Sequence, residues 1–195
     1  MAQRNITLED VLPEWDFAET HSLAVPDLPP AGIAPHIDAA LRAPDRWFEL
    51  AIGLRELPGR ILRRLGGQSV SLPREAFGLH SFTPLNAGQD DNNSRLYGLV
   101  GQFWRLDYGL VQIADLNAYL AIDDLPKLAL DVRASPDGQN GTRLETRTRI
   151  HCPTPEFRRQ FTPYWYLIRP VSGGIRRRML GKIATAARKA ATSAS

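Results

Sequence analysis

Polar residues that stand where the local pattern is apolar are the ones in this sequence whose types and spacing could do chemistry. Glu19 and His21 are two residues apart in residues 16–25, a segment whose other positions of the same parity are apolar. Alternate side chains of a strand share one face, so this carboxylate and this imidazole are expected together on the inner face. His21 oriented by Glu19 could serve as a general base of a hydrolase or cyclase, or the two could simply form a structural pair.

The same mismatch recurs in later segments whose patterns are typical of strands. The candidate ligand-binding residues are therefore Glu19, His21, Ser81, Gln102, Trp104, Thr146 and Thr148. A buried polar group without a partner costs about 1–3 kcal/mol, so these inward positions need an explanation. Either they pair with one another or with water, or they orient a ligand within a mostly apolar pocket. The sequence leaves both explanations open.

Other kinds of active site lack their sequence patterns. No Gly-x-Ser-x-Gly elbow is present, and the neighbours His151 and Cys152 would point to opposite faces of a strand. The four histidines are scattered without His-x-x-x-His spacing, and one cysteine cannot build a zinc site. We therefore expect no metal, no cofactor and no assigned catalytic residue, and we favour binding over catalysis.

The elements that must position these residues follow from periodicity and turn chemistry. Alternating or continuous apolar patterns predict strands at residues 16–25, 77–85, 95–106, 108–113, 127–134 and 142–151. Ile33, Ile37 and Leu41 predict a helix from residue 30 to 43, and Asp45 can cap a second one. A brief helix is expected at residues 115–122.

The C-terminal segment predicts a long helix. Its apolar stripe begins with Phe157, Phe161, Tyr164, Trp165 and Ile168. Pro163 and Pro170 favour kinks, and Ser172 can cap a second segment. That segment has an apolar stripe of its own, Ile175, Met179, Ile183 and Ala187.

This order of elements predicts an α+β protein in which a curved antiparallel sheet wraps around the long C-terminal helix, with two short helices after the first strand. The 195 residues suit one domain at residues 12–190, between an N-terminal extension (1–11) and a frayed tail (191–195). We find neither a membrane-spanning run nor a signal peptide, and the single cysteine favours a reducing, cytoplasmic compartment.

Several local strings are similar to a bacterial family of the helix-grip (START and polyketide-cyclase-like) superfamily. They are Glu19-Thr-His21-Ser22, Leu54-Arg-Glu-Leu57-Pro58, Gly98-Leu-Val-Gly101-Gln-Phe-Trp104 and Tyr164-Trp165…Arg169-Pro170…Ile175-Arg176. Related domains follow NAD-binding Rossmann domains in some proteins, but this chain has no Gly-x-Gly-x-x-Gly. Thr146-Arg147-Thr148-Arg149 departs from the family pattern Thr-Glu-Thr-Arg, so no acidic role transfers to Arg147. The family has no established reaction, so the resemblance implies a fold and a type of cavity.

The charge of the chain is unevenly distributed. All 21 acidic residues lie at or before Glu156, whereas nine of the 24 basic residues follow it. We expect the basic C-terminal helix to lie over an acidic body. The alternative is a surface that binds an anionic membrane or, through Arg176-Arg177-Arg178, the phosphates of RNA. Nucleic acid is the less favoured partner because no aromatic ladder accompanies these arginines.

The sequence thus predicts binding of a small, largely apolar molecule or lipid in a cavity between the sheet and the C-terminal helix. A cyclase- or hydrolase-type enzyme that uses His21 is the alternative in the same cavity. The oligomeric state is left open.

Overall fold

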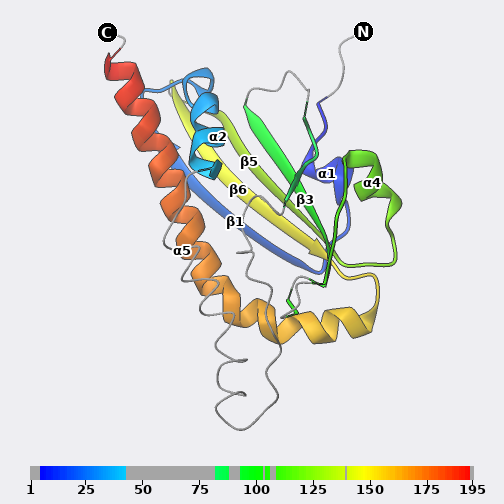
Figure 1. Ribbon diagram of the computed structural model, residues 1–195. Helices are drawn as coiled ribbons and strands as arrows, with labels where there is room; N and C mark the ends of the chain where they lie inside the picture. Colours follow the sequence, from blue (N-terminus) through cyan, green and yellow to red (C-terminus); the bar gives the residue numbers. More distant parts are fainter. Residues whose placement is uncertain are drawn as a thin grey trace.

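The computed structural model describes residues 5–42, 82–87, 93–102, 104–105, 109–138 and 140–193. Within these ranges the protein is α+β, an antiparallel sheet with a long C-terminal helix (Figure 1). The strands are β1 (Phe17–Val25), β2 (Thr83–Pro84), β3 (Ser94–Gly101), β4 (Leu110–Val111), β5 (Lys127–Asp137) and β6 (Gly141–His151). The helices are α1 (Leu8–Val11), the 3-10 turn η1 (Pro30–Gly32), α2 (Ala34–Arg42), α4 (Leu116–Ala121) and α5 (Pro155–Ser193).

The described strands form one sheet in the order β1-β6-β5-β3-β2, with β4 paired to β3. All pairings are antiparallel, and β1 and β6 are in register from Phe17↔Ile150 to Val25↔Thr142. The strands expected at residues 16–25, 127–134 and 142–151 are therefore present as β1, β5 and β6. The predicted second short helix and most of the strand predicted at 77–85 lie outside the described residues.

Helix α5 lies across one face of the sheet, against β1 and β6, and α2 packs beside it (Figure 1). Alternate residues of β6, from Leu144 to Ile150, face α5, as the sequence pattern predicts. Two apolar clusters fill this interface. The aliphatic cluster consists of Val25, Leu28, Ile33, Ile37, Leu130, Val132, Ala134, Leu144, Leu180, Ile183, Ala184 and Ala187. The aromatic cluster contains Phe17, Leu99, Trp104, Ile150, Cys152, Phe157, Phe161, Tyr164 and Trp165.

The α5 helix differs from expectation in two respects. It is one continuous helix through Pro163 and Pro170 and not two segments, although Figure 1 shows a bend part-way along it, in agreement with the kinks expected of the prolines. Ser172 therefore caps no second helix. The buried positions of its C-terminal half are Leu180, Ile183, Ala184 and Ala187, whereas Ile175 and Met179 are only partly buried. The buried stripe is thus rotated from the predicted one. Among the described residues, no helix is long and apolar enough to cross a membrane.

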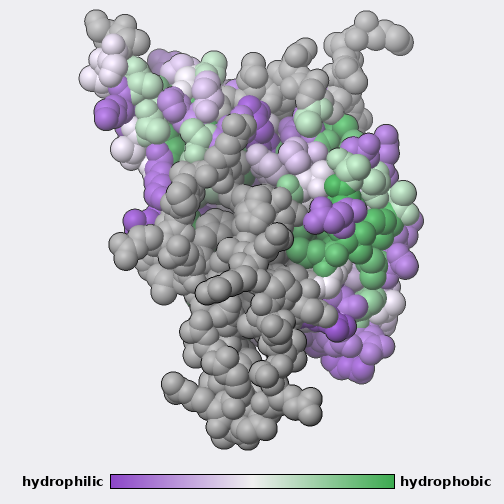
Figure 2. Space-filling model, in the orientation of Figure 1, coloured by the Kyte–Doolittle hydropathy of each residue, from purple (hydrophilic) through white to green (hydrophobic). Residues whose placement is uncertain are grey.

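The opposite face of the sheet is covered in part by α1 and α4. Leu8 and Val11 of α1 join a buried cluster with Tyr119 of α4. Gly98 of β3 lets α4 approach, because a Cβ there would lie 2.7 Å from the Tyr119 ring. Figure 2 shows hydrophobic residues gathered on the surface around α4, where Leu120 is 42% exposed.

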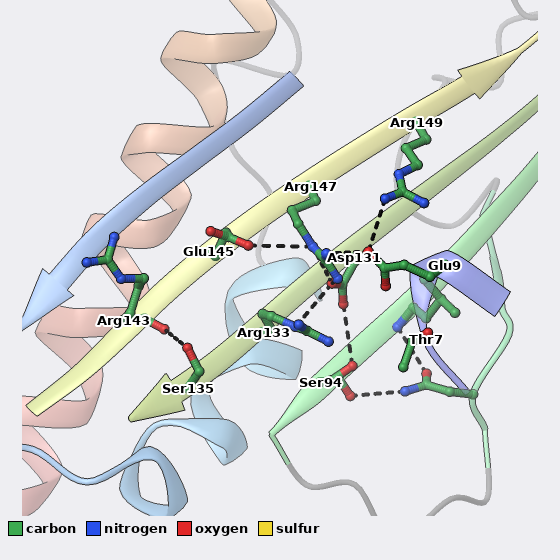
Figure 3. A network of polar contacts seen from close by, with 12 residues as sticks. Thr7, Glu9, Ser94, Asp131, Arg133, Ser135, Arg143, Glu145, Arg147 and Arg149 are labelled. Carbon is green, nitrogen blue, oxygen red and sulfur yellow. Dashed lines mark hydrogen bonds and ion pairs between the residues drawn. The ribbon is translucent and has the colours of Figure 1, made fainter. Parts of the chain in front are cut away.

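A charged network joins α1 to this face of the sheet (Figure 3). Arg147 donates from Nε and Nη2 to Asp131 Oδ2, at 3.0 and 2.6 Å, and from Nη1 to Glu9 at 2.7 Å. Arg149 donates to the same Glu9 oxygen at 3.0 Å. Asp131 and Arg147 lie on the face away from α5, as their parity predicts, yet Asp131 is only 1% exposed. Arg147 therefore holds α1 against the sheet.

Candidate functional site

A layer of polar side chains interrupts the apolar interface between the sheet and α5. We define the polar layer as Glu19, His21, Thr146, Thr148 and Arg176. Strand register brings the first four together, because Glu19 is opposite Thr148 and His21 is opposite Thr146. Along β1 the layer follows Phe17 of the aromatic cluster and precedes Val25 of the aliphatic cluster. The layer therefore lies between the two apolar clusters along β1 and β6, while Leu128 of β5 packs against both clusters.

Gly173 lets α5 come close to the polar layer. A Cβ on this residue would lie 3.1 Å from His21 Cε1, 3.2 Å from His21 Nε2 and 3.3 Å from Glu19 Oε1. Those distances are tight, so even a methyl group here would press on the imidazole and the carboxylate. Gly174, the next residue, has open space around its Cβ position. The backbone of α5 at Gly173 therefore packs directly against His21 and Glu19, the two residues that the sequence predicted to lie together.

Three buried polar atoms of the layer have no hydrogen-bond partner among the described residues. They are Glu19 Oε2, His21 Nε2 and Thr146 Oγ1. His21 Nε2 lies 3.0 Å from Glu19 Oε1, an ion-pair distance without the alignment of a hydrogen bond. The Glu19 side chain is 6% exposed, and Thr146 is fully buried. Pairing within the layer, one of the two explanations that the sequence left open, therefore satisfies only part of its polar groups.

Arg176 is the member of the layer that the sequence analysis did not include. It donates from Nη1 to Thr148 Oγ1, and from Nε to Ser172 Oγ at 3.1 Å. Burial lowers the pKa of its guanidinium to about 10, and the negative charge of Glu19 opposes this only in part. Arg176 therefore points inward and is no part of an exposed triple-arginine surface. One sequence signal could have indicated the inward position of Arg176. Arg176 lies three residues after Gly173 and four before Leu180, the spacing of one helix face.

The other predicted site residues lie apart from the polar layer or outside the description. Trp104 belongs to the aromatic cluster, with its ring centroid 5.3 Å from that of Phe161 and 6.3 Å from that of Phe157. Gln102 is partly buried, and its backbone N–H donates to the carbonyl of Gly109 at 3.1 Å. Ser81 lies outside the described residues. Four of the seven predicted residues, Glu19, His21, Thr146 and Thr148, are thus brought together.

Cys152 does not supply a nucleophile. Burial, together with the nearby negative charge of Asp16, raises the pKa of its thiol to about 12, although Arg158 acts in the opposite direction. A thiol with that pKa is almost wholly protonated at neutral pH, and the thiolate is the nucleophilic form. The described residues also hold no group of three or more His, Cys, Asp and Glu side chains that could bind a metal ion.

Comparisons with known proteins assign no family to this chain. No family model matches it, and no curated protein sequence matches it. A protein of Thermus thermophilus with a known crystal structure has a TM-score of 0.32 and 9% sequence identity, over 87% of this chain and 99% of that one. At that TM-score the likeness carries no argument. The functional conclusion therefore depends on the geometry of the polar layer.

Proposed function

We propose that this protein binds a small, largely apolar molecule between its sheet and α5, in a helix-grip arrangement. The polar layer receives one polar group of that molecule, and the neighbouring apolar clusters contact its remainder. The observation that carries the proposal is the set of three unpartnered buried atoms on Glu19, His21 and Thr146. Ligand sites are typically apolar with a few convergent polar groups, which is the composition of this interface.

The position of the unpartnered atoms supports this proposal over a purely structural role. Each atom left without a partner costs about 1–3 kcal/mol, and a structural polar layer has most of its atoms paired. A bound polar group would supply a partner to atoms of this layer that lack one in the ligand-free protein. The alternative is a hydrolase or cyclase that uses His21 as its base at the same place. Cys152 cannot serve as the nucleophile of such an enzyme, because its thiol stays protonated.

Mass spectrometry of the purified protein tests the proposal. Native spectra of the wild type are expected to show an added small mass that denaturing spectra lack. Gly173→Leu presses against His21 and Glu19 and is expected to lose that mass, whereas Gly174→Leu points into open space and keeps it. Gly173→Ala serves as the milder variant if the leucine prevents folding.

The proposal fails if the wild type carries no added mass and takes up none from alkyl carboxylates or alcohols. It also fails if folded Gly173→Leu binds the same molecule as tightly as Gly174→Leu does. In that case the molecule would lie elsewhere in the protein.

A further inference from the structure

The hydrogen bonds of Arg176 leave its charge without a direct counter-ion. A guanidinium has five N–H donors, and the two contacts of Arg176 are with neutral hydroxyl groups, those of Thr148 and Ser172. Among the described residues, no carboxylate lies within ion-pair distance of it. Glu19, the acid of the polar layer, has its ion-pair contacts with His21 at 3.0 Å and Arg169 at 3.9 Å.

The charges around the polar layer are therefore unbalanced. Arg169 and Arg176 bring two positive charges, and Glu19 brings one negative charge. Burial lowers the pKa of Arg176, and the attraction of Glu19 offsets this only in part. A buried cation is stable only when it is paired and hydrogen-bonded. One further negative charge beside Arg176 would complete the balance.

We propose that the ligand is an amphipathic carboxylic acid whose carboxylate binds Arg176 beside Thr146 and whose apolar part extends along the neighbouring clusters. This inference rests on the proposed function and names the class of its ligand. The planar fork of a guanidinium matches a carboxylate, which forms short, charge-assisted hydrogen bonds with it. The hydroxyl of Thr146 has a free donor for the same group.

A carboxylate fits this site better than a phosphate. A phosphate monoester carries close to two negative charges at neutral pH, whereas the polar layer together with Arg169 has an excess of one positive charge. Glu19 would repel the second charge in surroundings from which water is largely excluded. The unpartnered Oε2 of Glu19 also confines the anion to the Arg176 side of the layer.

Matched pairs of probes test the inference. Octanoate, decanoate and dodecanoate are each compared with the alcohol of the same chain length by calorimetric titration or native mass spectrometry. We expect the carboxylate of the best pair to bind about 10-fold or more tightly than its alcohol. Arg176→Gln is expected to weaken binding of the carboxylate far more than binding of the alcohol, and so to remove this preference.

Arg177→Gln is the matched control, because Arg177 is the next residue and is exposed. It is expected to keep the wild-type preference. Thermal melting establishes that each variant is folded, and Arg176→Lys, which keeps the charge but not the planar fork, is expected to show an intermediate preference.

The possible failures are distinguishable. If an alcohol or an alkyl phosphate binds as tightly as the carboxylate, or if Arg176→Gln keeps the preference, the carboxylate inference is wrong and the proposed function stands. If no probe of any pair binds and the wild type carries no added mass, the proposed function itself fails, and this inference fails with it. If the wild type carries an added mass but no probe binds, only the carboxylate inference fails.

Discussion

Thr142 and Thr146 lie four residues apart on the side of β6 that faces α5, yet their hydroxyl groups have different surroundings. Both side chains are fully buried. Thr142 Oγ1 donates to the carbonyl of Leu28 at 2.6 Å, whereas Thr146 Oγ1 has no partner among the described residues. The Thr142 hydroxyl thus has a structural hydrogen bond, whereas the hydrogen-bonding capacity of the Thr146 hydroxyl is unsatisfied.

Replacement of each threonine by valine, which has nearly the same shape, is expected to have opposite effects. In ligand-free protein, Thr146→Val should raise the free energy of unfolding by about 1 kcal/mol, because it removes an unsatisfied buried hydroxyl. Thr142→Val should lower it by about 1–3 kcal/mol, because it leaves the Leu28 carbonyl unpaired. Urea unfolding measures both. An equal loss of stability in the two variants would mean that Thr146 Oγ1 has a partner in the folded protein.

Residue patterns predicted four members of the polar layer and missed the fifth. Glu19, His21, Thr146 and Thr148 follow from the two-residue period of a strand, which leaves little freedom about the face that a side chain occupies. Arg176 does not follow, because an arginine beside two others is typical of an exposed helix face. The close approach at Gly173, which a sequence pattern does not reveal, decides which face is buried.

At the scale of elements, strand parity was a better guide than helix punctuation. Residues 127–134 and 142–151 lie in β5 and β6 as predicted, since both segments are long and alternate regularly. In α5 the prolines at 163 and 170 each remove a hydrogen bond, but burial of Phe161 and Trp165 on one side and of Leu180 and Ile183 on the other keeps the helix continuous. Packing of α5 against the sheet thus outweighs the tendency of the two prolines to end the helix.

The attachment of α1 to the sheet is expected to depend on pH through Glu9. Burial alone would raise the pKa of this carboxyl, but a backbone hydrogen bond and the nearby Arg147 and Arg149 bring it below its ordinary value of 4.5. A carboxyl whose pKa is lowered on folding stabilises the folded protein above its unfolded pKa, and this stability is lost as pH falls through the folded value. The contact should therefore be intact at neutral pH and weaken only below 4.5.

Hydrogen exchange of the α1 amides at neutral and at acidic pH measures this effect. Exchange should become faster on acidification in the wild type, after correction for the intrinsic pH dependence of exchange. Glu9→Gln should already exchange faster at neutral pH and change less with acid. Equal corrected changes in both proteins would contradict the role given to Glu9.

At the scale of the whole molecule, basic residues of α5 form ion pairs with acidic residues from the N-terminal part of the chain, in and next to β1. Arg158 pairs with Asp16 at 2.8 Å, and Arg169 lies 3.9 Å from Glu19. The expectation that the basic helix lies over an acidic body agrees with these pairs. The second pair includes Glu19 of the polar layer, where buried polar atoms of the helix–sheet interface have no partner among the described residues.

A ligand that binds at the polar layer lies beside the ring nitrogens of His21, whose NMR signals therefore report its binding directly. The chain has four histidines, so NMR of protein with isotopically labelled histidine gives few signals to assign. Titration with the alkyl carboxylate or alcohol that binds most tightly is expected to shift the His21 signals and leave those of His36 and His151 in place. Saturable binding that moves His36 or His151 and leaves His21 unchanged would contradict the account.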